Sequence, residues 1–233
     1  GTLSYLGAVV NSEDILFRPK EMTATAERFD LEEDRSKAIP QAVGLDVTIN
    51  WKPYADSMEV RTKKEPFDLY KEGDYKFTGL GILTPNGLKG SGLLNWEKAS
   101  MYSKDFSFGA FSARSDTMNV KIKALEADAL ALETSNLNGF ADFDQQYAKF
   151  KSNSDVGETF LPYNEYVTTM DEFEWDMEEQ IIIFKAKEDG LAQFISTHST
   201  KDSLAFLGKT ARYDLKTSRL EVGGVEQIRS ADA

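Results

Sequence analysis

Period-two alternation of apolar and polar residues over residues 75–124 constrains the fold of this chain more than any other feature. Large apolar residues recur at every second position or at multiples of two. They fall into three groups of one parity each: Leu88, Leu94 and Trp96; then Phe106, Phe108 and Ala110; then Met118, Val120 and Ile122. Alternation of this kind is typical of β-strands that bury one face. We therefore predict strands throughout this region.

Two local signals within the region predict interruptions of the strands. The apolar parity of Phe77 changes to that of Leu80 and Ile82 across Gly79. One extra residue flips every side chain that follows it, so this change of parity predicts a β-bulge at the glycine. Pro85-Asn86-Gly87 predicts a turn, because proline presets φ and Asn-Gly tolerates positive φ.

The rest of the chain shows similar short strands separated by turns. We expect strands within residues 1–20, 22–31, 45–49, 58–62, 173–184, 194–197, 204–207, 211–215 and 220–222. Residues 121–134 fit a strand, with a helix as the alternative, because Leu125, Ala129 and Leu132 also stand at helical spacing. Residues 148–166 contain a Ser-Asn-Ser-Asp run, a glycine and a proline, which predicts a long loop.

These patterns predict an all-β fold, either an elongated β-groove or jelly-roll or a solenoid-like stack of short strands. The expected division is an N-terminal β segment, 1–70, and a sheet stack, 71–233, although one continuous domain fits as well. A weak internal echo supports stacking, since Thr25–Leu31 resembles Thr210–Leu215 with one residue deleted. We also expect the chain to be a piece of a longer protein.

Composition excludes several classes of function. The 39 acidic and 27 basic residues give a formal net charge of −12, which argues against nucleic acid and against a polybasic membrane patch. Without any cysteine there can be no disulfide and no thiolate metal site. The 15 Phe, 9 Tyr and 3 Trp can fill a core without such cross-links.

The acidic run 171–179 is the sharpest local feature. On a strand, Phe173, Trp175 and Met177 point to one side, and the carboxylates of Glu172, Glu174, Asp176 and Glu178 point to the other. Four carboxylates on one face could hold calcium or, less readily, supply the acid and base of a glycosidase. A solvated acidic face of a half-buried strand explains the same spacing.

The other candidate motifs have simpler structural explanations. The single histidine, His198, is flanked by Ser and Thr but is expected at a strand end or in a loop. Gly87–Gly92 lacks the Gly-Lys-Ser/Thr ending of a phosphate-binding loop. A group of aromatic side chains could form a platform for sugar stacking, although their alternation favours the core: Trp51, Tyr54, Trp96, Phe106, Phe108 and Phe111. We predict no catalytic residue and no cofactor apart from a possible calcium ion.

The run Ser203–Val225 resembles the OstA-type unit of lipopolysaccharide-transport proteins, in which an alanine-aromatic-aspartate strand, a turn and a strand ending in glycine are repeated. Other stretches are similar to segments of very large envelope proteins of Bacteroidota: Phe17–Ala24, Trp51–Met58, Gly87–Gly92, Phe150–Asn153, Phe173–Trp175 and Ala231–Ala233. The resemblance implies a β-groove or jelly-roll stack in the periplasm or outer envelope that handles lipid or polysaccharide. It supplies no catalytic residue.

From these features we expect a non-catalytic structural segment of the envelope, with a groove suited to lipid or lipopolysaccharide. The alternative is a glycan-binding β-sandwich, assisted by calcium through residues 172–178. The expected partners are neighbouring segments of a parent chain, or further copies that associate through sheet edges. Lipid or glycan is an additional expected ligand, and nucleic acid is not.

Overall fold

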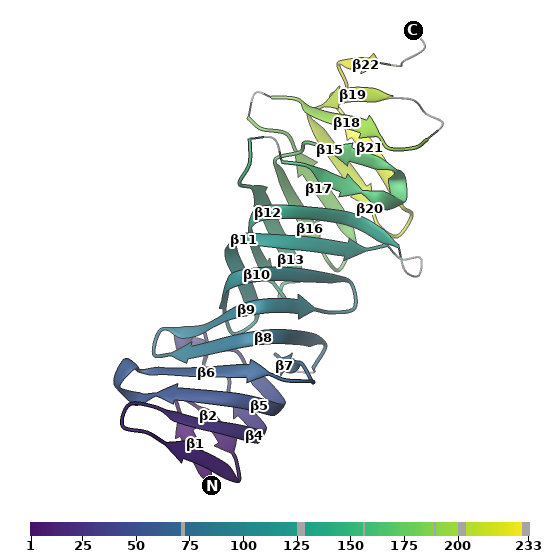
Figure 1. Ribbon diagram of the computed structural model, residues 1–233. Coiled ribbons are helices and arrows are strands. Elements are labelled where there is room, and N and C mark those ends of the chain that lie inside the picture. The colour runs from purple at the N-terminus through teal and green to yellow at the C-terminus, as the bar shows by residue number, and fades with distance from the viewer. Residues whose placement is uncertain (71–72, 125–128, 156, 189, 200–203, 230–233) are drawn as a thin grey trace. The chain divides into compact units, whose positions relative to one another are not determined.

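The computed structural model describes residues 1–70, 73–124, 129–155, 157–188, 190–199 and 204–229. Within these residues the chain forms 22 β-strands and three single 3₁₀ turns, and the described strand registers are all antiparallel (Figure 1). The predicted all-β fold class is confirmed. Among the described residues, no helix has the length and apolar character needed to cross a membrane.

The chain divides into two compact units. Unit 1 comprises Gly1–Glu97 and Tyr102–Ser115, and unit 2 comprises Lys98–Met101 and Asp116–Ala233. The boundary expected after residue 70 falls inside unit 1.

The strands of unit 1 are β1 (Thr2–Tyr5), β2 (Ala8–Asn11), β3 (Asp14–Phe17), β4 (Met22–Leu31), β5 (Ala42–Lys52), β6 (Ser57–Thr62), β7 (Phe67–Leu69), β8 (Tyr75–Thr84) and β9 (Gly87–Asn95). The turns η1 (Arg35–Lys37) and η2 (Pro53–Ala55) lie between them. Two strands, β10 (Ala99–Phe108) and β11 (Ser112–Lys123), contribute residues to both units.

The strands of unit 2 are β12 (Leu130–Asp142), β13 (Tyr147–Ser152), β14 (Thr159–Leu161), β15 (Tyr166–Thr168), β16 (Glu172–Asp176), β17 (Ile181–Lys185), β18 (Ala192–Ser196), β19 (Ala205–Gly208), β20 (Thr210–Asp214), β21 (Arg219–Gly223) and β22 (Gln227–Arg229). The turn η3 (Pro162–Asn164) joins β14 to β15.

Long strands that change partner half-way along organise unit 1. One half of β4 pairs with β2 and the other with β3. Likewise β5 pairs with both β6 and β7, and both of these pair with β8. Each long strand therefore belongs to two half-sheets. Val47, Met58 and Leu83 are fully buried, and a single sheet layer cannot cover both of its faces. The two half-sheets therefore enclose the core between them.

Unit 2 repeats this plan with separate strands in place of bent ones. One half-sheet has the order β12-β13-β16-β17-β20-β21. The other has the order β12-β14-β15-β18-β19-β22. Among the described strands of unit 2, only β12 contributes to both, and the chain passes from one half-sheet to the other after every hairpin. Figure 1 shows β15, β18 and β19 in one layer of the unit and β16, β20 and β21 in the other.

Hydroxyl side chains lie where the strands bend or break. Between β2 and β3, Ser12 Oγ lies 2.7 Å from the carbonyl oxygen of Thr25 and accepts the N–H of Asp14 at 3.1 Å. Thr62 Oγ1, at the end of β6, accepts the N–H of Gly79 at 2.9 Å. In unit 2, Ser152 Oγ accepts the N–H of Ser154 at 3.1 Å. Sheet ladders stop at these points, so hydroxyls satisfy backbone groups that would otherwise be unpaired.

The β-bulge predicted at Gly79 is wrong. The ladder between β8 and β9 runs without an extra residue from Lys76 opposite Asn95 to Thr84 opposite Gly87. Leu80 and Ile82 instead point to the outer face, and the buried parity of Phe77 continues to Leu83.

The backbones of β8 and β9 approach each other closely at Gly79 and Gly92, which explains why both positions are glycine. Gly79 and Gly92 face each other in the ladder with φ of 154° and 156°. A Cβ on either residue would clash with a carbonyl oxygen of the opposite strand. The pair therefore allows a bend without an inserted residue.

The predicted alternation of apolar residues is confirmed from Leu88 to Ile122, since the residues of that pattern are buried except Ala110, which is half-buried. The turn at Pro85-Asn86-Gly87 is confirmed as the link between β8 and β9. In segment 121–134, for which a strand or a helix was expected, residues 121–123 belong to β11 and residues 130–134 belong to β12. Residues 125–128 lie outside the described part. The long loop predicted at 148–166 is largely wrong, because most of β13, all of β14 and the start of β15 lie there.

Candidate functional site

The acidic strand predicted as a cation site is β16, and its inward side is as expected. Phe173, Trp175 and Met177 are at most 3% exposed. The strand ends at Asp176, so Glu178 lies in the following turn and not on the same face. The four predicted carboxylates are therefore divided between a strand face and a turn.

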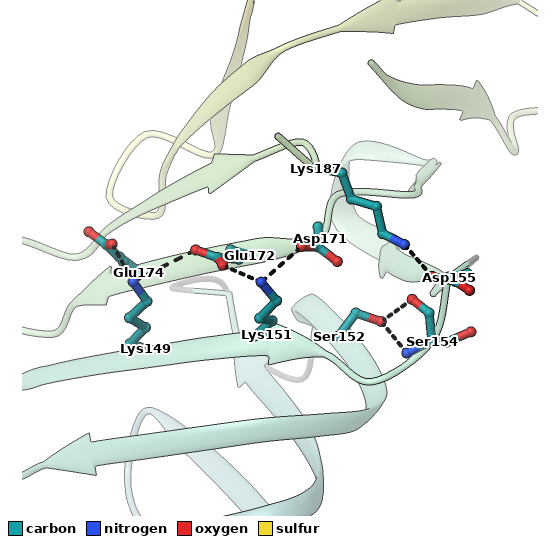
Figure 2. Close-up of polar contacts among 9 residues, drawn as sticks. All are labelled: Lys149, Lys151, Ser152, Ser154, Asp155, Asp171, Glu172, Glu174 and Lys187. Atoms are coloured by element: carbon teal, nitrogen blue, oxygen red, sulfur yellow. Dashed lines mark hydrogen bonds and ion pairs between the residues drawn. The ribbon is translucent and has the colours of Figure 1, made fainter. Parts of the chain in front are cut away.

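Lysines from the flanking strands pair with the carboxylates that do lie on the strand face (Figure 2). Lys151 Nζ lies 2.9 Å from Glu172 Oε1 and 3.6 Å from Asp171 Oδ2. Glu174 Oε1 lies 3.2 Å from Lys185 Nζ and 3.4 Å from Lys149 Nζ. We call Lys149, Lys151, Glu172, Glu174 and Lys185 the lysine–glutamate face.

The ionisation of this face follows from those pairs. The hydrogen bond from Lys151 holds the pKa of Glu172 below its usual value, and the bond from Lys185 does the same for Glu174. The hydrogen bond to Glu174 raises the pKa of Lys149. Burial raises the pKa of the neighbouring phenol of Tyr147. Glu172, Glu174 and Lys149 are thus each stabilised in the charged form by a group of opposite charge.

Asp176 has a structural role at the turn. Its Oδ1 accepts the backbone N–H groups of Glu178 at 3.1 Å and of Glu179 at 2.8 Å. In the described residues no group of three or more His, Asp or Glu side chains is placed to hold a metal ion. Calcium binding here stays a prediction, and calcium would have to displace lysine from Glu172 and Glu174.

A cavity of about 370 Å³ lies next to this face, where the links between the half-sheets of unit 2 come together. Asp171 and Lys187 line it, together with Ser152, Ser154 and Asp155. These groups bond to one another or to the lysine–glutamate face: Lys187 Nζ lies 2.6 Å from Asp155 Oδ1, and the two serines are linked (Figure 2). The cavity is polar, but its charges are already neutralised locally.

A second cavity, of about 470 Å³, opens on the outer face of the half-sheet β3-β4-β5-β6-β8 in unit 1. Cross-strand neighbours form two rows of side chains across it. The first row is Leu16, Thr23, Asn50 and Glu59, and the second is Asp14, Thr25, Thr48, Arg61 and Leu80. We call these nine residues the threonine face. Its polar groups were not among the predicted site residues.

The predicted aromatic platform does not form one surface. Trp96, Phe106 and Phe108 are buried in the core, which confirms the alternative explanation for them. Tyr54, by contrast, is 87% exposed in η2. Trp51 packs against Tyr5 with ring centroids 5.5 Å apart.

His198 lies in the loop after β18, as expected from the sequence. Its Nε2 lies 3.5 Å from Glu165 Oε2. Gly87–Gly92 forms the start of β9, so its glycines serve the strand and its turn.

Comparison with known proteins adds no relative: no family model, no curated protein and no solved structure matches this chain.

Proposed function

We propose that the protein is a non-catalytic structural scaffold segment that extends by pairing its edge strands with neighbouring segments or with further copies. The observation that supports this proposal most directly is the state of the outermost strands. In the described residues, β1 pairs only with β2, β3 only with β4, β21 only with β20, and β22 only with β19. Each unit therefore presents open edges.

Apolar side chains at these edges favour association. Phe17 on β3 lies in the same cross-strand row as the buried Met58, yet is 69% exposed. Ile228 on β22 continues the row of the buried Phe194 and is 68% exposed. The rows of buried apolar side chains thus continue onto the edge strands, where their last members are exposed. An exposed apolar edge strand is a template for pairing with a further strand.

The filled interior favours a scaffold over a lipid carrier. Trp175, Tyr213, Phe150, Phe184 and Phe194 point inward in unit 2 and are essentially inaccessible to solvent. An acyl chain could enter only if the half-sheets moved apart. The envelope location of the scaffold rests on the OstA-type resemblance alone.

The backbone geometry of β3 gives a direct test of edge pairing. The N–H of Arg18 donates to the carbonyl of Glu21 at 2.9 Å, so the alternation of an antiparallel ladder directs the N–H of Phe17 away from β4. Phe17→Pro would remove this outward donor, whereas Phe17→Thr removes the ring and keeps the donor. If edges pair, wild-type protein shows concentration-dependent mass in light scattering, Phe17→Thr weakens the association and Phe17→Pro weakens it more.

A monomeric mass at every concentration, from micromolar to near-millimolar, would count against self-association and leave only pairing with other segments. Native mass spectrometry after exposure to a bacterial envelope lipid extract tests the role as carrier. A bare protein is expected, and retained lipid mass would contradict the filled interior.

A further inference from the structure

We propose that the threonine face of unit 1 is a binding site for a neutral saccharide. The proposal is independent of edge pairing, because it concerns the outer face of the half-sheet and not its edge. Its cavity of about 470 Å³ falls within the usual range for small-ligand sites, and it is built on five neighbouring strands. Sites on strands hold their side chains more rigidly than sites on loops.

The polar groups of the threonine face are available for a ligand. The side chains of Thr23, Thr25 and Thr48 make no hydrogen bond to any described residue. Neither Asp14 nor Arg61 has an ion-pair partner within the described part of the chain. On the lysine–glutamate face of unit 2, by contrast, the charged side chains pair with one another.

Asn50 gives the most specific sign of a missing partner. Its Oδ1 is buried and has no hydrogen-bond donor among the described residues. A buried acceptor of this kind is unfavourable unless water or a ligand satisfies it. Rotation of the amide about χ2 exchanges its oxygen and nitrogen, so Asn50 can meet either a donor or an acceptor of the ligand.

The charge of the face selects the class of ligand. Asp14 and Glu59 are negative and Arg61 is positive, and Lys52 Nζ neutralises Glu59 at 2.6 Å from its Oε1. The four charges cancel, so the site does not attract an anion such as a phosphate. Carboxylate, amide, guanidinium and hydroxyl groups together suit a ligand whose own groups both donate and accept.

The two ends of the face add apolar contacts. Leu16 is 53% exposed on β3, and Leu80 lies at the other side of the cavity on β8. They can contact the C–H surfaces of a sugar ring. Within each row, neighbouring side chains are separated by the distance between strands, about 4.8 Å, which is close to the length of one sugar residue in an extended glycan. In an oligosaccharide that lies across the strands, each sugar unit would therefore contact one side chain of a row.

The test uses the whole chain with neutral oligosaccharide probes: cellotriose, maltotriose, laminaritriose and chitotriose, followed by a glycan array. For a probe that binds, calorimetry would give Kd for wild type and for Asn50→Leu, Arg61→Met and Thr48→Val. We expect at least tenfold weaker binding for the first two and a several-fold loss for Thr48→Val, which keeps shape and removes one hydroxyl. Thr78→Val and Arg114→Met, at exposed strand positions outside the cavity, should leave Kd unchanged.

Three results would overturn the proposal. The first is no binding of any neutral glycan on the array. The second is binding that the three cavity variants leave intact. The third is binding confined to sulfated or phosphorylated glycans, which would assign the site to anions. Circular dichroism of each variant separates lost contacts from lost folding, and Thr25→Val replaces Thr48→Val if the latter fails to fold.

Discussion

The lysine–glutamate face of unit 2 and the threonine face of unit 1 are both outer surfaces of antiparallel half-sheets, yet they differ in how their side chains are satisfied. On the former, Glu172 and Glu174 each lie within 4 Å of two lysines. On the latter, hydroxyls, an amide and two charges have no partner in the described residues. A strand face can therefore neutralise itself or remain available, depending only on which residues the register places opposite each other.

The largest effect is expected where the bend that shapes unit 1 is removed. Gly92→Ala places a Cβ against the carbonyl oxygen of Thr78, at a φ of 156° that side chains rarely adopt. Strain and clash together should lower the free energy of unfolding by about 3 kcal/mol or more. The matched control is Gly81→Ala, since a Cβ there makes only ordinary contacts with Leu88 and Val60. Urea unfolding of both variants would measure the difference, and equal losses would refute the role given to the bend.

The second prediction concerns a substitution that gives the threonine face an ion pair like those of the lysine–glutamate face. Thr25→Lys places an ammonium group directly opposite Asp14, as Lys151 lies opposite Glu172 in unit 2. Saccharide binding should fall at least tenfold, which is about 1.4 kcal/mol, while stability changes by no more than about 0.5 kcal/mol. Calorimetry and urea unfolding measure the two quantities. Thr78→Lys is the control, and unchanged affinity in Thr25→Lys would show that the face does not bind the glycan.

The third prediction concerns the loss of ion pairs from the lysine–glutamate face. Glu174→Gln removes the negative charge that pairs with Lys149 and Lys185, and it should cost about 0.5–1 kcal/mol at pH 7, less at high salt. The folded-state pKa of Glu174 lies below its ordinary 4.5, so its contribution is present above pH 4.5 and is lost as pH falls through the folded-state value. Urea unfolding at pH 7 and at pH 3 should therefore show a smaller difference from wild type at pH 3 than at pH 7. A constant difference would mean that the pairs contribute nothing.

The smallest effect is expected from calcium. Because lysines already neutralise Glu172 and Glu174, millimolar calcium should raise the melting temperature by less than about 1 °C. Differential scanning calorimetry with and without calcium, on wild type and on the double variant Glu174→Ala, Asp176→Ala, measures this shift. A larger shift that the double variant abolishes would instead support the calcium site expected from the sequence.

Much of the local structure could be predicted from the sequence because burial follows the period of the strand. Phe173 and Trp175 had to share one side of β16, and the turn at Pro85-Asn86-Gly87 followed from backbone preferences. The β-bulge predicted from the change of apolar parity at Gly79 was wrong, because Leu80 and Ile82 are apolar but face outward. No local rule distinguishes an inserted residue from a pair of glycines that face each other.

The sequence by itself determined that this chain forms short, alternating strands with an aromatic core, since those properties depend on neighbours one and two residues away. Only the tertiary structure decided which charges meet. Lys185 is 11 residues from Glu174 in sequence, Lys149 lies on the earlier strand β13, and both reach Glu174 through strand register. Asp14, Thr48 and Arg61 form one row for the same reason. Register is a long-range property set by packing of the whole core, so neither the paired face nor the available one could be read from local spacing.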